Sequence, residues 1–149
     1  MPRDIDRSSC SKAGRCDEVI FVFFMLQGLS PMLESHDLVG TVRFYVDILG
    51  FNCDAYEEGW SWVFLSLDDV HIMFTSPNPH RNLQKAIMSG SLYIRTNAVE
   101  TLWQMLREKV NICYELEKFE YGMYEFAIYD NNGYILQFAQ EIPVDASIH

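Results

Sequence analysis

The residue that stands out chemically is a glutamate inside an apolar run. Glu125 lies between Tyr124 and Phe126 in the segment MYEFAIY (123–129), which alternates like a strand. A carboxylate buried without a partner costs free energy, so it must face a cleft or a cationic group. We therefore predict that Glu125 lines a ligand cleft.

Histidines and nucleophiles give little support to catalysis. His71 shares a strand face with Met73 in VHIMFT (70–75), since alternate residues of a strand point the same way. His36, His80 and His149 fall beside a helix start, in a loop and at the terminus. The sequence offers no Ser-His-Asp set, no reactive Cys-His pair and no glycine-rich phosphate loop. These features favour binding over catalysis.

The cysteines do not suggest a metal site or a disulfide framework. Cys10, Cys16, Cys53 and Cys113 form no CxxC motif and no zinc spacing with histidine. Cys53 and Cys113 lie in apolar runs, so we expect reduced core thiols in a cytoplasmic protein.

Aromatic side chains supply flat surfaces beside the acids. Trp60, Trp62 and Phe64 alternate along one predicted strand and share a face. Aromatic walls with acidic groups suit a planar, cationic ligand. The competing interpretation is that the tryptophans are core or interface packing. Further aromatic candidates are Tyr93, Tyr121, Tyr124 and Tyr134.

The net charge of −10 narrows the class of partner. Residues 1–30 carry four basic and four acidic side chains, so the whole excess lies on residues 31–149. This acidity argues against nucleic acid and permits steering of a cationic ligand, although it also suits a soluble bacterial-type cytosolic domain. The longest apolar run, Val19–Leu26, is too short for a membrane span.

The elements that position these residues repeat once along the chain. A helix is predicted from Asp37, a side chain suited to capping, to Gly50, where a left-handed residue ends it. A second helix begins at Asn97, 60 residues later, with Glu100 placed for a capping box. Both halves read β-α-β-β-β, an α+β duplication. The predicted strands are 31–36, 51–57, 60–67 and 70–75, then 91–96, 111–117, 123–129 and 134–139.

The ends of the chain lie outside this repeat. We predict an N-terminal extension at 1–29, one domain at 30–141 built of modules 30–76 and 89–141, and a tail at 142–149. Val19–Leu26 could add a strand or pair with another chain. An alternative is that the natural protein starts at Met25, which the intact mass of natively expressed protein would test.

Two motifs carry a family resemblance. The pattern Asp-Leu-x₅-Phe-Tyr-x₃-Leu-Gly-Phe (37–51), paired with Asp-Asn-Asn-Gly-Tyr-Ile-Leu-Gln-Phe (130–138), resembles the vicinal oxygen chelate superfamily. Its members include glyoxalase I, extradiol dioxygenases, thiol transferases that modify antibiotics, and bleomycin-resistance proteins. The resemblance implies mixed sheets curled around a cleft and a homodimer.

The same resemblance identifies four metal positions, and this chain departs from all of them. They fall near Ser30, on Met73, near Ser91 and on Gln137. Divalent metals prefer imidazole or carboxylate ligands, and only Gln137 is even a weak candidate. We therefore expect no metal cofactor. A shifted divalent site using His71, Glu34 or Glu125 stays open as an alternative.

Taken together, the sequence predicts a metal-independent small-molecule-binding protein resembling the antibiotic-sequestering bleomycin-resistance branch, cytoplasmic and without nucleic-acid or membrane partners. One alternative is a metal-dependent lyase, isomerase or dioxygenase with a shifted site. Another is a dimeric scaffold that binds nothing. The predicted ligand-binding residues are Trp60, Trp62, His71, Met73, Tyr93, Tyr124, Glu125 and Gln137.

Overall fold

The computed structural model describes residues 27–56, 59, 61–77, 80, 84–85 and 87–143. Two predictions lie outside these residues: the added strand or pairing segment at Val19–Leu26 and the ligand-binding role of Trp60. Within the described residues, the structure has two helical segments, one π-helical turn and eight strands. They are β1 (Met32–Glu34), α1 (Leu38–Arg43), η1 (Phe44–Ile48), β2 (Asn52–Ala55), β3 (Trp62–Leu67), β4 (Val70–Thr75), β5 (Leu92–Arg95), α2 (Val99–Leu106), β6 (Asn111–Lys118), β7 (Met123–Tyr129) and β8 (Ile135–Glu141).

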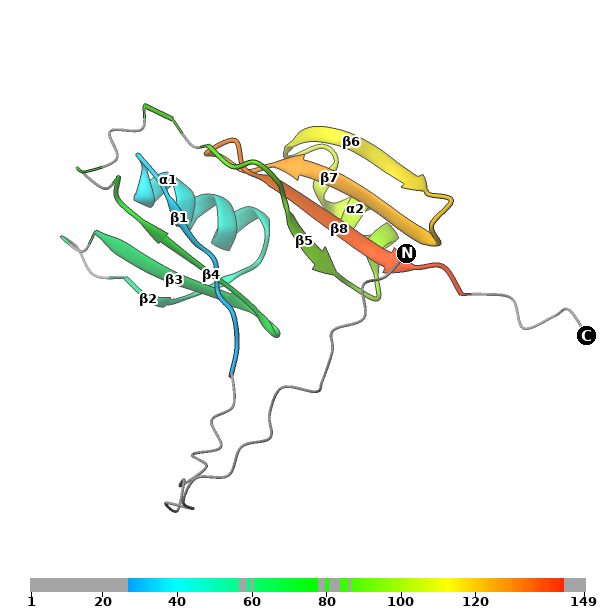
Figure 1. Ribbon diagram of the computed structural model, residues 1–149, viewed down its shortest axis with the longest axis horizontal. Coiled ribbons are helices and arrows are strands. Elements are labelled where there is room, and N and C mark those ends of the chain that lie inside the picture. The colour runs from blue at the N-terminus through cyan, green and yellow to red at the C-terminus, as the bar shows by residue number, and fades with distance from the viewer. Residues whose placement is uncertain are drawn as a thin grey trace, which may run out of the picture.

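The strands form two sheets of the same topology. The first has the order β1-β4-β3-β2 and the second β5-β8-β7-β6. In each sheet one parallel pair, β1 with β4 or β5 with β8, joins strands that are otherwise antiparallel. Figure 1 shows the two modules side by side, each with its helix against one face of its own sheet. The duplicated α+β fold is confirmed.

Strand alternation divides each sheet into a core face and an open face. Val63 and Leu65 are fully buried on the helix side of β3, whereas Trp62 and Phe64, which alternate with them, are half-buried on the other side. We call the side opposite the helices the open face of each sheet. In the view of Figure 1 both helices lie behind their sheets, so the open faces share one side of the molecule.

The first helix follows its sequence signals closely. The Asp37 carboxylate accepts a hydrogen bond from the Gly40 amide at 2.8 Å, and Gly50 ends the helix with φ of 80°. Phe51 folds back on Tyr45, with ring centroids 5.4 Å apart. The last turn, Phe44–Ile48, is π-helical, which periodicity did not predict.

The second helix differs from its prediction at the start. Its N-cap is Ala98 rather than Asn97, and no side-chain capping bond forms there, so the capping box with Glu100 is wrong. The Gln140 side chain from β8 instead accepts a hydrogen bond from the Val99 amide at 3.0 Å. A partner distant in sequence therefore satisfies this helix terminus.

A buried polar network joins α1 to the second module. The Tyr45 hydroxyl donates to the Asp130 carboxylate at 3.0 Å, across 85 residues of chain. The Asn131 and Asn132 amides donate to the Thr41 hydroxyl at 3.1 and 3.0 Å. Burial raises the pKa of Asp130, and hydrogen bonds from the Tyr134 and Asn132 backbone act in the opposite direction. This network connects the β7–β8 turn to α1.

Cys53 does not match the core-thiol prediction. It is exposed on β2, the edge strand of its sheet, while Cys113 is half-buried on β6. An edge strand is covered on one side only, so its apolar run does not guarantee burial.

In the part of the chain that the structure describes, no helix has both the length and the apolar character needed to cross a membrane.

Candidate ligand-binding site

The site is centred on Glu125, in the middle of β7 on the open face of the second sheet. Its side chain is 2% exposed. Phenol hydroxyls donate to both carboxylate oxygens: Tyr114 and Tyr121 to Oε1 at 2.9 and 2.8 Å, and Tyr93 to Oε2 at 2.7 Å. We call these four residues the tyrosine–carboxylate cluster.

The cluster continues through two positions that the family resemblance assigns to metal ligands. The Gln137 amide donates to the Tyr114 hydroxyl at 2.7 Å. The Ser91 hydroxyl donates to the Gln137 side-chain oxygen. A chain of hydrogen bonds therefore runs from Ser91 through Gln137 and Tyr114 to Glu125, and each donor in it is a neutral group.

The hydrogen bonds determine the charge state of Glu125. Burial by itself raises the pKa of this carboxyl, but hydrogen bonds from Tyr93, Tyr121, Tyr114 and Gln137 outweigh it and leave the pKa below its usual value. Glu125 is therefore ionised at neutral pH. Burial and the neighbouring Glu125 charge raise the pKa of Tyr93 to about 12, so this phenol stays neutral.

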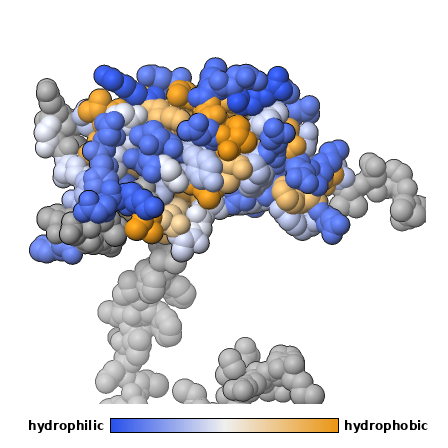
Figure 2. Space-filling view, turned by 90° about the horizontal axis from the view of Figure 1, so that it is seen from above, coloured by the Kyte–Doolittle hydropathy of each residue, from blue (hydrophilic) through white to orange (hydrophobic). Residues whose placement is uncertain are grey.

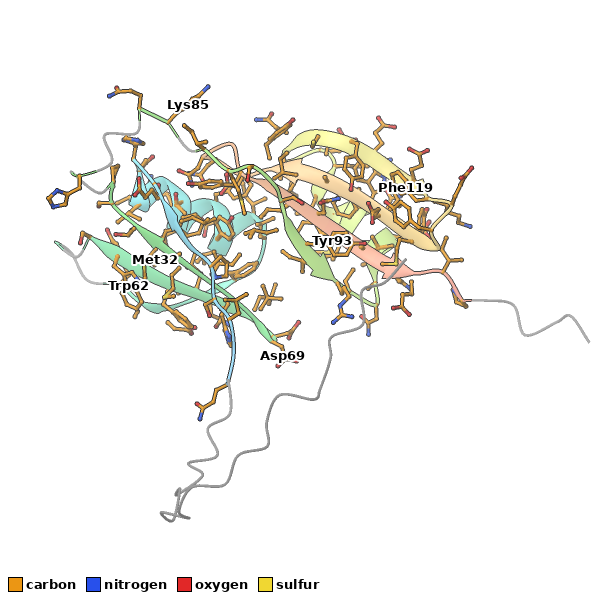
Figure 3. The ribbon with its side chains drawn as sticks, in the orientation of Figure 1. Met32, Trp62, Asp69, Lys85, Tyr93 and Phe119 are labelled. Atoms are coloured by element: carbon orange, nitrogen blue, oxygen red, sulfur yellow. The ribbon has the colours of Figure 1, made fainter. Side chains whose placement is uncertain are left out.

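Two of the three aromatic rings of the cluster, those of Tyr93 and Tyr121, remain accessible. Tyr93 is 47% exposed and Tyr121 is 63% exposed, although both hydroxyls point to Glu125. Phe119 stacks on Tyr121 at 5.1 Å between ring centroids and meets Tyr114 edge-on at 5.9 Å. Figure 3 labels Tyr93 on β5 and Phe119 near the β6–β7 turn.

Local backbone features place two of the tyrosines. Pairing between β6 and β7 shifts register between Ile112 and Tyr114 and again between Tyr114 and Glu117. Such bulges re-aim a side chain, and Tyr114 reaches the open face while Ile112 and Leu116 pack against the core. Gly122, with φ of 84°, closes the turn that carries Tyr121 back over Glu125.

Tyr114 was absent from the predicted site. Strict alternation would have placed it with its core-facing neighbours, so the sequence carried no simple signal for it. The pairing of Glu117 with Glu125 across β6 and β7 adds a second acidic residue beside the cluster.

The other predicted residues lie in different places. Trp62, His71 and Met73 lie on the open face of the first sheet, where Phe64 stacks on His71 at 5.5 Å between ring centroids. Tyr124 packs against the core side, because it precedes Glu125 on the same strand. Trp60 is outside the described residues. Of the predicted residues that the structure describes, Tyr93, Glu125 and Gln137 come together here.

The donors present do not fit a divalent metal. Among the described residues, no three His, Cys, Asp or Glu side chains are grouped closely enough to hold an ion. This also applies to His71, Glu34 and Glu125, the alternative set. At the two positions of the second module that the resemblance assigns to metal ligands, the structure places a hydroxyl and an amide, which are poor ligands for such ions. Glu125 adds a single carboxylate, and phenols donate to both of its oxygens.

Comparison with known proteins identifies the family. The sequence profile described as the Glyoxalase/Bleomycin resistance protein/Dioxygenase superfamily matches residues 32–138. The chain belongs to this superfamily. No curated protein matches the sequence.

Solved structures of this superfamily fold resemble the chain at low identity. A protein of unknown function from Agrobacterium tumefaciens str. C58 has a TM-score of 0.66 at 19% identity, covering 81% of this chain and 98% of that one. TioX from Micromonospora sp. ML1 has a TM-score of 0.62 at 13% identity, covering 76% and 98%. A lactoylglutathione lyase from Agrobacterium tumefaciens has a TM-score of 0.58 at 15% identity, covering 77% and 94%. At these identities the likeness shows the fold alone.

Proposed function

We propose that this superfamily member binds a cationic small molecule with a planar aromatic part at the tyrosine–carboxylate cluster, and holds it without a metal and without chemical conversion. One observation carries the proposal: a buried, ionised carboxylate whose described hydrogen-bond partners are neutral phenols. The negative charge is stabilised but not neutralised, so it remains available to attract a cation.

The chemistry of the cluster suits such a ligand. Tyr93 and Tyr121 donate to Glu125 and stay largely exposed. A cation over an aromatic ring gains roughly 0.5–2 kcal/mol, depending on how far it is desolvated. Glu117 and the net charge of −10 add long-range attraction. A planar group can stack on the exposed faces of Tyr93 and Tyr121.

Sequestration of an antibiotic such as bleomycin is the specific form of this proposal. Bleomycin combines a planar aromatic arm with a cationic tail, which matches the aromatic rings and the carboxylate respectively. Superfamily membership supports this choice without deciding it, because one fold hosts many activities.

A fluorescence titration tests the proposal. Chelator-treated protein is titrated with copper-free bleomycin, and we expect saturable quenching of intrinsic fluorescence that weakens as salt is raised. Glu125→Gln should weaken the affinity at least tenfold. Glu100→Gln, an exposed glutamate in the first turn of α2 on the other side of the sheet, is the matched control and should bind like the wild type.

The same experiment separates the alternatives. No saturable quenching at any concentration would favour the scaffold without a ligand. Binding that appears only after zinc, nickel, manganese or iron is added, with stoichiometric metal in the purified protein, would favour a metal-dependent lyase, isomerase or dioxygenase. Either result would contradict the proposal.

A further inference from the structure

A pocket lies between the two modules on the helix side, away from the tyrosine–carboxylate cluster. Its volume is about 400 Å³, within the range of small-molecule sites. It is bordered by the end of η1, the β3–β4 turn, β5 and α2. Its apolar walls are formed mainly by Phe51, Leu67, Ile94, Leu102, Leu106 and Phe138.

The internal repeat explains why this space is apolar. The Ser35 hydroxyl accepts a hydrogen bond from the Asp37 amide at 3.1 Å, and the Thr96 hydroxyl accepts one from the Ala98 amide at 3.2 Å. Thr96 follows Ser35 by 61 positions, and Ala98 follows Asp37 by the same number. With this offset, Thr41 and Tyr45, the polar residues that contact the β7–β8 turn, have apolar counterparts in α2. Leu102 takes the place of Thr41, and Leu106 takes the place of Tyr45.

The repeat also explains why the space is unfilled. The β7–β8 turn runs through residues 130–134 and sends Asp130, Asn131 and Asn132 against α1. The equivalent β3–β4 turn contains only Asp68 and Asp69, because Leu67 already pairs with Val70. The shorter turn supplies no side chain that corresponds to the asparagines, and the pocket occupies that place.

Charges of both signs line the rim of the pocket. Asp68 and Asp69 come from the β3–β4 turn, and Arg95, the last residue of β5, comes from the strand face that it shares with Tyr93. Figure 3 shows Asp69 at the tip of that hairpin, on the side of the second module. Thr101 of α2 adds a hydroxyl to the lining. A ligand that matches this rim carries a cation and an anion close together, next to an apolar group.

We propose that this inter-module pocket binds a free amino acid with a large apolar side chain, such as leucine or phenylalanine. The α-ammonium group pairs with the Asp68 and Asp69 carboxylates, and the α-carboxylate pairs with the Arg95 guanidinium, which is suited to planar carboxylate recognition. The side chain replaces water against the leucine and phenylalanine walls.

Calorimetric titration with L-leucine and L-phenylalanine tests the ligand class. We expect saturable binding with a dissociation constant on the order of millimolar or below, as suits a ligand of this size. 4-Methylpentanoate lacks the ammonium group and 3-methylbutylamine lacks the carboxylate, so each should bind at least tenfold more weakly than leucine. The proposal would be overturned if either analogue bound as tightly as leucine. It would also be overturned if neither amino acid showed saturable binding.

Two variants at exposed positions locate the binding. Arg95→Gln removes the carboxylate partner, and Thr101→Trp fills the rim with an indole ring. Each should weaken leucine binding at least tenfold. Arg43→Gln, at an exposed arginine on α1, is the matched control and should leave it unchanged. Wild-type affinity in both rim variants would refute this site.

Discussion

At the scale of single residues, Glu125 shows how a charge is retained in a buried position. Water normally solvates a carboxylate, and here three phenol hydroxyls take its place at 2.7 to 2.9 Å. Hydrogen bonds to a charged group contribute more than neutral ones, and they keep the pKa of Glu125 low despite burial. The same bonds hold the tyrosine rings in fixed orientations.

The first prediction concerns stability and pH. Folding lowers the pKa of Glu125, so its ionised form stabilises the fold above its unfolded pKa, and this contribution is lost as pH falls through the lower folded pKa. Glu125→Gln should cost about 1.5–3 kcal/mol of unfolding free energy at pH 7. In denaturant unfolding between pH 7 and pH 3, the difference in unfolding free energy between the wild type and the variant should shrink on acidification. A difference that grows as pH falls would contradict this.

A second residue-level prediction concerns Tyr114, which links Glu125 to Gln137. Tyr114→Phe removes a donor from the carboxylate and an acceptor from the Gln137 amide. We expect a loss of about 1–3 kcal/mol in unfolding free energy, measured with urea. Tyr56→Phe changes a 39% exposed residue on the first module and should stay within about 0.5 kcal/mol of the wild type. Equal effects of both changes would argue against the cluster.

At the scale of elements, the β7–β8 turn holds the second module to α1 and η1 through buried polar contacts. The Asp130 carboxyl is 4% exposed and accepts from Tyr45, Asn132 and Tyr134. Polar groups at this depth are costly if left unpaired, so the contact is specific as well as stabilising. The corresponding place at α2 is apolar and open, so the two repeats are chemically different.

The prediction at this scale is a double-mutant cycle. Tyr45→Phe should cost about 1–3 kcal/mol because it leaves the buried Asp130 carboxylate without its phenol donor. The double variant with Tyr45→Phe and Asp130→Asn should lose less unfolding free energy than the sum of the two single losses, because both single changes remove the same contact. Thermal and urea unfolding of the four proteins gives the coupling, and strict additivity would refute the contact.

Local signals predicted the elements well and the site only in part. Asp37, Gly50 and the 130–133 turn specify local geometry, so the duplicated fold followed from them. Tyr114 was missed because its orientation depends on two bulges that form only when β6 pairs with β7. The start of α2 was misplaced because its cap partner, Gln140, lies on a distant strand. Features that need tertiary pairing are not visible in periodicity.

At the scale of the whole molecule, both open faces lie on one side and carry exposed apolar groups. Met32 is 56% exposed on β1, and Tyr93 and Tyr121 are also accessible. Figure 2 shows apolar groups interspersed with hydrophilic ones on the face seen from above. The open side is therefore the surface where we propose that a second copy of the chain covers the ligand.

The prediction at this scale is a homodimer. Light scattering after gel filtration should give twice the 17.4 kDa mass of the chain. Met32→Glu should shift the equilibrium toward the monomer, because it places a charge on the exposed apolar surface of β1. Val39→Glu, at a 46% exposed position on α1, is the control and should remain dimeric. A wild-type protein that is monomeric at all concentrations would contradict the proposal.

The central claim is that the tyrosine–carboxylate cluster binds a cation without a metal, and an NMR titration tests it most directly. Chelator-treated protein labelled with ¹³C at tyrosine and glutamate side chains is titrated with copper-free bleomycin. We predict saturable shifts concentrated on Tyr93, Tyr114, Tyr121 and Glu125. Saturable shifts confined to other residues, or no shifts until a divalent metal is added, would contradict the account.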